Sequence, residues 1–416
     1  MKILWITNTT FPEANSLLSG YKKSLRSSGG WMVAGADSLA SNDNVHLAIV
    51  SIADVKELVH LQGRRMEYYL IPKGSGNQTV NHEYEPFFTI IFDEFRPDIT
   101  HIHGTEFSHG LAFVEACGAD NVVVSVQGIC SEISNHYLDG FSCLDIIRNL
   151  TIRDVIKGTP YTEQKSWAKR GEYEKMLIKK VKHVIGRTEW DRAFVWSVNN
   201  NIVYHHCNET LRPEFYTGKW QYEKCSPHTI FVSQAYYPIK GLHQVLKALP
   251  MIIREYPDVN VRVAGNNVLK YSIRNRTTYF QYLRTCVQKN KLDDYIHFCG
   301  PLSAEEMKRE FLSANVFICP SSIENSSNAL CEAILLGVPV LASHVGGLCT
   351  IMEGQLQNLY RYDDVGVLAY KVCDVFAKKE KLLNSIKIAS QRHNPDANSK
   401  TLLDVYKSII QVSQVP

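Results

Sequence analysis

The feature that most constrains the fold of this 416-residue chain is a pattern of short apolar segments that alternate with helical stretches. In the first half the expected strands cover residues 3–7, 45–52, 99–103 and 122–126, with a helix expected at 31–39. Each run is short and bounded by polar residues or glycine, which is typical of buried strands. Strands that alternate with helices predict parallel pairing and a doubly wound α/β sheet.

The same pattern restarts near residue 229, after a looser segment at 208–221 that contains Pro213 and Gly218. Single hydrophobic cores rarely grow beyond about 250–300 residues, so two domains are expected. We predict an N-terminal Rossmann-like domain at 1–215 and a C-terminal one at 216–399. The later strands are expected at 229–233, 259–264, 296–299, 316–319 and 338–342, and the helices at 243–255, 304–314 and 328–336.

Composition excludes several classes of protein. The formal net charge of +3 is too small to indicate a nucleic-acid-binding protein. The 11 cysteines include no Cys-x-x-Cys pair, which argues against a zinc ribbon and for reduced, mostly buried thiols. No apolar stretch approaches about 18 residues, and the first apolar run turns polar at Asn8, too early for a signal peptide. We expect a cytoplasmic protein.

The most informative stretch is Pro-Ser-Ser-Ile-Glu-Asn-Ser-Ser-Asn-Ala-Leu-Cys-Glu-Ala at 320–333, between an expected strand and an expected helix. Ser326, Ser327 and Asn328 are all favourable residues at a helix N-terminus. Such a terminus at the end of a parallel strand binds anions through its free N–H groups and its dipole. Glu324 and Glu332 could hold two parts of one ligand, or they could be an ordinary loop carboxylate and an ordinary helix carboxylate.

The order Pro-Ser-x-x-Glu, seven residues, Glu-Ala, then Gly-Val-Pro-Val and Gly346-Gly347 resembles the donor-site signature of family 4 retaining glycosyltransferases of GT-B fold. The resemblance implies two facing Rossmann-like domains with a cleft between them. It also implies that Glu324 contacts the donor sugar and that Glu332 holds the ribose of the nucleotide. A C-terminal helix at about 400–416 would pack back on the first domain.

A second match lies at 231–242, where the family usually carries Gly-Arg after a strand and Lys-Gly six residues later. Lys240 and Gly241 are present, and a lysine is a suitable partner for phosphate. Gln234 replaces the arginine, so this position can donate a hydrogen bond but no charge. Lys240 would then stabilise the diphosphate leaving group, and Gly300, which ends the strand at 296–299, is assigned to the same donor site.

Weaker matches lie in the first half. Gly29 and Gly30 resemble the family's glycine loop, although a plain turn would look the same. His101 and His103 fall on one face of a strand and either line the cleft or serve the structure, and we assign His103 to the acceptor side. Gln127 stands where the family often has a histidine beside the transferred sugar, so we count it among the catalytic residues.

Residues 185–193 and 204–212 resemble a subgroup encoded in bacterial capsule and exopolysaccharide gene clusters. Arg187 follows an expected strand there. It could supply the positive charge that Gln234 lacks, which would make it a donor-binding residue. It could instead form a structural ion pair with Glu189 or Asp191.

The resemblance implies transfer of a sugar from a nucleotide diphosphate sugar, with UDP favoured, to a saccharide or lipid-linked acceptor in bacterial surface polysaccharide synthesis. No Asp-x-Asp motif is present, so we expect a metal-independent reaction without a cofactor. Catalysis would rest on positioning and on stabilisation of the leaving diphosphate. The alternatives are a sugar-nucleotide epimerase of the same fold and a catalytically decayed sugar-nucleotide-binding subunit.

A local basic cluster lies at 157–182, which contains eight basic and three acidic residues, an excess of five positive charges. The cluster could be the solvated face of a helix, or it could contact the anionic inner surface of the cytoplasmic membrane. We slightly favour the solvated helix and keep peripheral membrane contact as the alternative.

Overall fold

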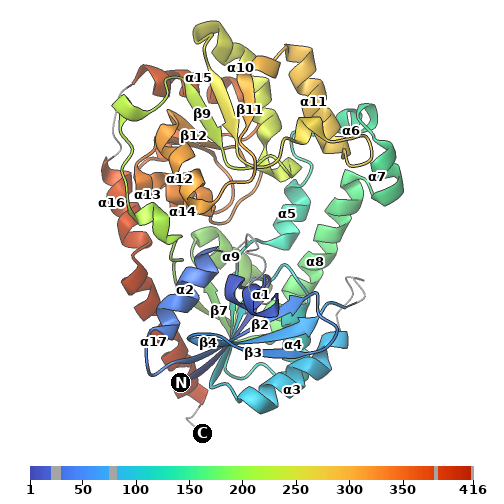
Figure 1. Ribbon diagram of the computed structural model, residues 1–416, viewed down its shortest axis with the longest axis vertical. Coiled ribbons are helices and arrows are strands. Elements are labelled where there is room, and N and C mark those ends of the chain that lie inside the picture. Colours follow the sequence, from blue (N-terminus) through green and yellow to red (C-terminus); the bar gives the residue numbers. More distant parts are fainter. Residues whose placement is uncertain (20–29, 75–81, 379–382, 414–416) are drawn as a thin grey trace. The chain divides into compact units, whose positions relative to one another are not determined.

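A computed structural model of the chain describes residues 1–19, 30–74, 82–378 and 383–413 (Figure 1). The chain forms two compact units. Unit 1 consists of residues 1–131, 169–212 and 393–416, and unit 2 consists of residues 132–168 and 213–392. Each unit is a sheet covered by helices, as the alternating pattern predicted.

Unit 1 contains an eight-stranded sheet in the order β3-β4-β2-β1-β5-β6-β7-β8. Its strands are β1 (Lys2–Thr7), β2 (His46–Ala53), β3 (Val59–Gln62), β4 (Met66–Pro72), β5 (Ile99–His103), β6 (Val122–Ser125), β7 (His183–Gly186) and β8 (Val203–His206). Its helices are α1 (Pro12–Leu18), α2 (Gly30–Ala40), α3 (Glu85–Phe95), α4 (His109–Cys117), α9 (Glu189–Val198) and α17 (Pro395–Ser413). All pairings are parallel except that of β3, which runs antiparallel to β4 at one edge.

Successive residues of the unit 1 strands pack into two separate hydrophobic cores. Leu4 and Ile6 belong to one core, whereas Ile3 and Trp5 belong to the other. Because side chains alternate along a strand, both faces of this sheet are buried. That explains why its strands read as continuous apolar runs rather than as alternating ones.

The C-terminal helix α17 packs against α2 and β5 of unit 1. Tyr406 of this helix is fully buried, and its hydroxyl accepts a hydrogen bond of 3.0 Å from the indole nitrogen of Trp5. The same hydroxyl lies 2.6 Å from Nδ1 of His101. The last helix therefore completes the core that the first strand begins.

Unit 2 contains a six-stranded, wholly parallel sheet in the order β11-β10-β9-β12-β13-β14. Its strands are β9 (Thr229–Val232), β10 (Asn260–Val263), β11 (Ile296–Phe298), β12 (Val316–Cys319), β13 (Val340–Ser343) and β14 (Leu359–Tyr360). Helices from the main segment are α10 (Leu242–Glu255), α11 (Thr278–Asn290), α12 (Ala304–Ser313), α13 (Asn328–Leu336), α14 (Leu348–Ile351), α15 (Val365–Ala377) and α16 (Leu383–Arg392). The earlier segment supplies α6 (Cys143–Arg148) and α7 (Ile152–Lys157), while α5 (Cys130–His136) and α8 (Pro160–Lys180) connect the units.

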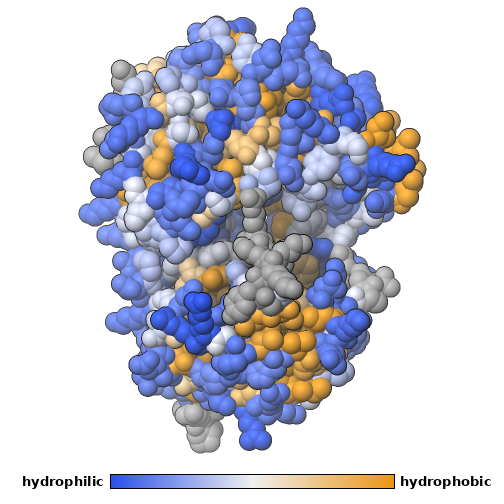
Figure 2. Space-filling model, viewed as in Figure 1, coloured by the Kyte–Doolittle hydropathy of each residue, from blue (hydrophilic) through white to orange (hydrophobic). Residues whose placement is uncertain are grey.

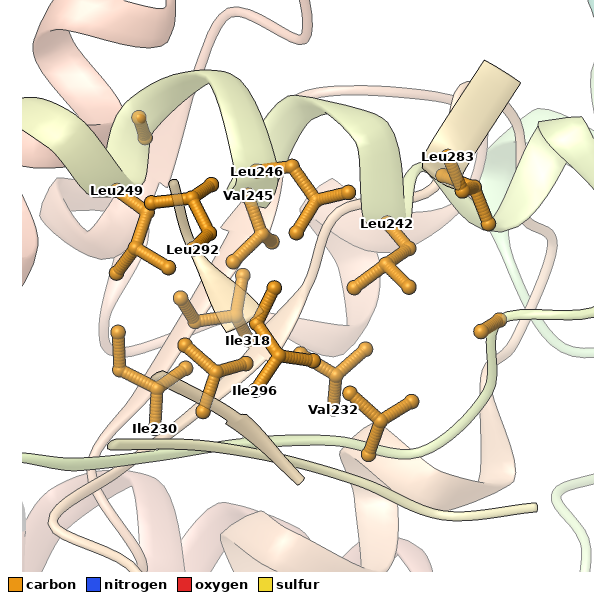
Figure 3. Packing of buried hydrophobic residues seen from close by; sticks show 14 of the residues in the cluster. Ile230, Val232, Leu242, Val245, Leu246, Leu249, Leu283, Leu292, Ile296 and Ile318 are labelled. Atoms are coloured by element: carbon orange, nitrogen blue, oxygen red, sulfur yellow. The ribbon is translucent and has the colours of Figure 1, made fainter. Parts of the chain in front are cut away.

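Helix α10 covers one face of this sheet with a stripe of leucine and valine side chains (Figure 3). Leu242, Val245, Leu246 and Leu249 recur at helical spacing and are at most 1% exposed. They pack in the same core as Ile230 and Val232 of β9. Each such burial contributes roughly 1.5–3 kcal/mol, so this interface holds α10 firmly against β9.

The division of the chain differs from the expected domains in three respects. Unit 2 begins again at Pro213 rather than at 216, and the chain returns to unit 1 at His393 rather than at about 400. Residues 132–168, expected in the first domain, belong to unit 2. Phe141 and Ile146 of this segment pack in the unit 2 core, the Thr285 hydroxyl donates to Asn149 at 2.7 Å, and the Thr278 backbone N–H donates to Asp154 at 2.6 Å.

The eleven cysteines are all free. Within the described ranges, no helix combines the length and the hydrophobicity needed to cross a membrane.

Candidate active site

A cavity of 220 Å³ opens in unit 2 at the carboxyl ends of the neighbouring strands β9 and β12. It is lined by Val232, Ser233, Gln234, Lys240, Cys319, Pro320, Ser321, Glu324, Ser326, Ser327, Asn328 and Ala329. The carboxyl ends of adjacent parallel strands meet at one edge of a sheet, where α/β proteins bind ligands. Two segments that the sequence singled out, 231–242 and 320–333, therefore meet in one place.

Lys240 and Glu324 form an ion pair in this cavity. Oε1 of Glu324 accepts hydrogen bonds from the Lys240 ammonium group and, at 2.9 Å, from the Ser321 hydroxyl. Burial favours a neutral lysine, but the charge and hydrogen bond of Glu324 outweigh it and raise the pKa of Lys240. The cavity therefore holds a fixed cation at neutral pH.

Close backbone packing holds the loops around the pair. Gly241 has φ +69°, and a Cβ atom there would lie 1.7 Å from the Pro320 carbonyl oxygen, so only glycine fits. The Ser322 N–H donates to the Ile239 carbonyl at 2.8 Å, which ties the lysine loop to the glutamate loop. Gly347 N–H donates to the Glu324 carbonyl at 3.0 Å. These contacts place the cation and the carboxylate with little freedom.

The N-terminus of α13 forms one wall of the cavity. Ser327, its N-cap residue, has extended backbone angles, and its side chain makes no capping hydrogen bond. Ser326 and Asn328 also line the cavity, and Oδ1 of Asn328 is buried without a hydrogen-bond partner among the described residues. Uncapped N–H groups and the helix dipole beside Lys240 form an arrangement suited to a phosphate.

The other residues assigned to the donor site differ in position. Gln234 lines the cavity, as the strand-end match implied. Glu332 is buried in α13 with 2% exposure and is not among the lining residues. Gly300 follows β11 with φ +75° and accepts a hydrogen bond of 2.9 Å from Gly265, and it does not line the cavity either.

Three further predicted residues meet in a small cavity of 60 Å³ in unit 1. His103, Gln127 and Arg187 line it. The ring of His103 stacks on His101 at 3.8 Å, and neither ring nitrogen has a hydrogen-bond partner within the described part of the chain. Burial, reinforced by the charge of Arg187, lowers the pKa of His103 to about 3, so its imidazole is neutral at pH 7.

Arg187 is only 3% exposed, and its guanidinium pairs with Glu209, which is also buried. Its Nη2 donates to the Val126 carbonyl at 3.0 Å. Asp191 accepts from the Arg187 backbone N–H rather than from its side chain. The alternative of a structural ion pair at Arg187 therefore holds, but with Glu209 as the partner, while the charge of Asp191 also helps to raise the pKa of Arg187.

Of the predicted glycine pair Gly29 and Gly30, the structure describes only Gly30. Gly30 begins α2, and a Cβ atom there would come within 3.0 Å of the Arg212 side chain. Gly29 lies outside the described residues.

Two carboxylates in unit 1, the partly buried Glu106 and the buried Glu174, were missed by sequence reasoning. Glu106 accepts hydrogen bonds from the Gly128 N–H at 3.1 Å and from the Asn8 amide at 3.0 Å. The Thr105 hydroxyl donates to Glu174 at 2.5 Å, and burial raises the pKa of Glu174 to about 8. The signal for Glu106 was its position just after the strand at 99–103, whereas Glu174 is one of three glutamates on a charged helix.

Glu106 also lines the largest cavity described for unit 1, of 470 Å³, at the carboxyl ends of β1, β2, β4 and β5. No cluster of three or more His, Cys, Asp or Glu side chains suited to a metal ion occurs among the described residues.

Residues 226–378 match the family described as "Glycosyl transferases group 1". This segment lies within unit 2 and contains the Lys240–Glu324 cavity. A second line of similarity comes from curated relatives. One is an uncharacterized glycosyltransferase of Methanocaldococcus jannaschii, 23% identical over 44% of this chain and 45% of the relative. Another is a D-inositol 3-phosphate glycosyltransferase of Corynebacterium urealyticum, 25% identical over 41% of each. The match thus spans less than half the length of these relatives.

Solved structures match over nearly the whole chain. The sucrose-phosphate synthase from Thermosynechococcus elongatus has a TM-score of 0.71 at 14% identity, covering 99% of this chain and 100% of the other. Anabaena HepE, solved in complex with UDP and glucose, has a TM-score of 0.65 at 14% identity, covering 98% and 100%. The chain therefore has the GT-B fold, with two parallel-sheet α/β units, as the resemblance implied.

Proposed function

We propose that this chain is a retaining glycosyltransferase that transfers a sugar from a nucleotide diphosphate sugar to a saccharide or lipid-linked acceptor without a metal ion. The observation that carries the proposal is the joint presence of Lys240, Glu324 and the α13 N-terminus in one 220 Å³ cavity. A cation and a helix N-terminus suit a diphosphate, and a carboxylate suits sugar hydroxyls. The match to group 1 glycosyl transferases covers the same segment.

In this mechanism the bond between the sugar and the diphosphate breaks, and negative charge grows on the departing phosphate oxygen. The Lys240 ammonium and the N–H groups of α13 stabilise that charge. Because they are already in place, no reorganisation is needed at the moment of reaction. The acceptor oxygen attacks the same face of the sugar, and its proton passes to the leaving phosphate, so the anomeric configuration is retained.

Glu324 has two tasks in this scheme. In the free protein it holds the Lys240 side chain in the cavity. With the donor bound, one of the Glu324 oxygens remains available to accept hydrogen bonds from sugar hydroxyls. The Lys240 ammonium group then also interacts with the diphosphate. This fits the role that the family resemblance assigns to the first glutamate of the motif.

The finer assignments extend the proposal. Glu332 holds the ribose, with UDP as the favoured nucleotide. Gln127 contacts the transferred sugar, and the neutral His103 lies on the acceptor side. Arg187 contributes to donor binding through its positive charge. A role in bacterial surface polysaccharide synthesis follows from the resemblance of 185–212 to that subgroup. HepE, crystallised with UDP and glucose, supports the choice of nucleotide by analogy of fold.

One observation favours a second candidate, a sugar-nucleotide-binding protein that has lost transfer activity. Gln234 leaves Lys240 as the only cationic side chain among the described residues that line the cavity. A single cation suffices for binding but weakens the stabilisation of the leaving group.

A two-stage experiment tests the proposal. A panel of nucleotide sugars is first screened for thermal stabilisation of the protein, since a ligand that binds the folded state raises its melting temperature. The best donor is then incubated with lipid-linked and saccharide acceptors in excess EDTA, and the product anomer is determined by NMR. Acceptor-dependent transfer with retention supports the proposal. Thermal stabilisation by a donor without turnover identifies the decayed subunit, and turnover of the donor without an acceptor identifies an epimerase. If transfer is absent in EDTA and returns when magnesium is added, the metal-independent mechanism is refuted.

A further inference from the structure

Helices α6 and α7 of unit 2 carry a large exposed apolar surface. It consists of six aliphatic side chains: Leu144, Ile147, Leu150, Ile152, Val155 and Ile156. Their exposed fractions run from 46% for Leu150 to 77% for Ile156. Figure 2 shows hydrophobic residues gathered over the position that α6 and α7 occupy in Figure 1. Scattered exposed leucines are normal, but so many within 13 residues indicate a binding surface.

The segment that carries both helices buries polar side chains and leaves most of its aliphatic ones exposed, with Ile146 as the buried exception. Asp154 is 2% exposed and accepts from the Thr278 N–H, while its neighbours Val155 and Ile156 are exposed. Asn149 is 6% exposed and accepts from the Thr285 hydroxyl. Rotating either segment to bury the aliphatic residues would break these hydrogen bonds and leave buried polar groups without their partners.

Both helices are also fixed at their ends. Ser142 and Asp145 form a reciprocal capping box at the start of α6, and the Thr151 side chain caps α7. Phe141 and Ile146 anchor the segment in the unit 2 core, where Phe141 stacks on Tyr282 at 4.7 Å. The apolar surface is therefore a rigid platform rather than a disordered loop.

The fully exposed charged groups of α6 and α7 are positive, whereas α8 carries both an exposed glutamate, Glu163, and an exposed lysine. Arg148 and Lys157 are exposed at the ends of α6 and α7, and Lys165 is exposed on α8. The acidic groups of α6 and α7 are engaged, since Asp145 serves the capping box and Asp154 pairs with Arg153. Exposed cations beside an apolar face complement anionic headgroups.

We propose that the α6–α7 apolar surface inserts into the interfacial region of an anionic lipid bilayer, with Arg148 and Lys157 at the level of the headgroups. Protein interfaces are enriched in tryptophan, tyrosine and arginine at their centres, whereas this surface is purely aliphatic. Aliphatic side chains framed by lysine and arginine suit a bilayer better than a second protein. The proposal stands independently of glycosyl transfer, although it would bring the chain to a lipid-linked substrate.

Vesicle co-sedimentation of the full chain tests this surface. Binding is measured on vesicles of equimolar phosphatidylglycerol and phosphatidylcholine, and on phosphatidylcholine alone. The double variant Ile152→Glu/Ile156→Glu replaces two of the most exposed aliphatic residues with anions. We expect its partition coefficient on anionic vesicles to fall by at least about tenfold, because it loses apolar insertion and adds repulsion.

The matched control is Ile90→Glu/Ile273→Glu. These isoleucines are 51% and 68% exposed and lie outside the surface, so the control makes the same change in net charge and in exposed aliphatic residues. It should bind nearly as the unmodified chain does. Equal loss in both variants would mean that charge alone governs binding, and the assigned surface would be wrong.

A second variant, Arg148→Gln/Lys157→Gln, separates the headgroup contribution from insertion. It should lower binding to anionic vesicles by about tenfold and leave binding to phosphatidylcholine unchanged. Absence of vesicle binding by the unmodified chain would overturn the proposal. So would a dimer in sedimentation velocity that Ile152→Glu/Ile156→Glu converts to monomers while vesicle binding persists, because the surface would then be a protein interface.

Discussion

The Lys240 ammonium group and the Glu324 carboxylate pair across 84 residues of sequence. Their loops meet because β9 and β12 are neighbours in the unit 2 sheet, so the segments after these strands begin at the same edge. The pair keeps a positive charge inside a cavity where an unpaired lysine would tend to lose its proton. A leaving group that arrives there finds its counter-charge already oriented.

Replacing this cation should impair turnover more than binding. Lys240→Ala leaves the developing charge facing only backbone N–H groups and Gln234, and loss of one preorganised donor typically lowers turnover by about 10²–10³. Gln234→Arg in the Lys240→Ala background should restore part of the rate. Steady-state kinetics with the identified donor measure both effects.

The exposed Lys289, replaced by alanine, is the control for loss of one positive charge. Near-normal turnover of Lys240→Ala would mean that the diphosphate binds elsewhere. The same conclusion would follow if arginine at position 234 gave no rescue while Arg187→Ala had no effect.

Removing the Glu324 carboxylate should separate binding from transfer. In Glu324→Ala the diphosphate itself takes over as the counter-charge of Lys240, so calorimetry should show UDP affinity nearly unchanged, while transfer falls because the sugar contact is lost. Ser321→Ala deletes only one hydrogen bond to Glu324 and should lower transfer less. A collapse of UDP affinity in Glu324→Ala would assign this carboxylate to the nucleotide instead of the sugar.

The proposed ribose contact of Glu332 is tested by an isosteric change and a ligand that lacks one hydroxyl. Glu332→Gln should weaken UDP binding by roughly 1–3 kcal/mol, the scale of a hydrogen bond to a charged group. The 2′-deoxy nucleotide should be much less sensitive to the substitution. Equal losses for both ligands would indicate that the buried side chain supports α13 rather than the ribose.

Gly241 and Gly300 form a natural pair for measuring loop strain. Their φ angles are +69° and +75°, but a Cβ atom would strike the Pro320 carbonyl at Gly241 and meet nothing within 4 Å at Gly300. Gly300→Ala should lower the free energy of unfolding only by the cost of a left-handed residue, about 1–2 kcal/mol. Gly241→Ala should lower it clearly more, as measured by urea unfolding, and should also weaken donor binding. Equal destabilisation would contradict the close packing of the two loops.

Because of Glu174, we expect the free energy of unfolding to fall as pH rises. Burial raises its pKa from 4.5 to about 8, so between these values the folded state holds a proton that the unfolded state has released. The stabilisation is present below about pH 4.5 and is lost as pH rises through about 8, at up to 1.4 kcal/mol per pH unit. Urea unfolding of Glu174→Gln should lack this slope. Glu172→Gln, which removes an exposed carboxylate from the same helix, is the reference, and equal slopes in both variants would sink the assignment.

The sequence predicted β1, β2, β5 to β7 and β9 to β13, because parallel strands buried on two faces leave apolar runs, but β4, β8 and β14 were not predicted. The segments at 99–103, 316–319 and 328–336 match their elements residue for residue. The meeting of Lys240 with Glu324 was also within reach, since both follow strands of one sheet. The antiparallel edge strand β3 was not predicted, because its four residues alternate between partly buried and exposed positions.

Other features depend on contacts that no local pattern reveals. Glu209 lies in the aperiodic segment taken as a domain boundary, so its pairing with Arg187 could not be inferred from spacing. Residues 132–168 belong to unit 2 through the burial of Phe141 and Ile146 in its core and through hydrogen bonds to α11, 124 and 136 residues away. Their outward aliphatic residues contradict the usual pattern, in which apolar side chains mark the core.

The hydrogen bond between Trp5 and Tyr406 joins residues 401 positions apart. During synthesis, which proceeds from the N-terminus, the Trp5 indole has no partner until Tyr406, 401 residues later, has left the ribosome. Unit 2, whose last segment ends at Arg392, can close earlier. Unit 2 of the nascent chain would thus fold before unit 1 is complete. A stop codon shortly before α17 would leave the unit 1 core around β1 exposed to chaperones and proteases.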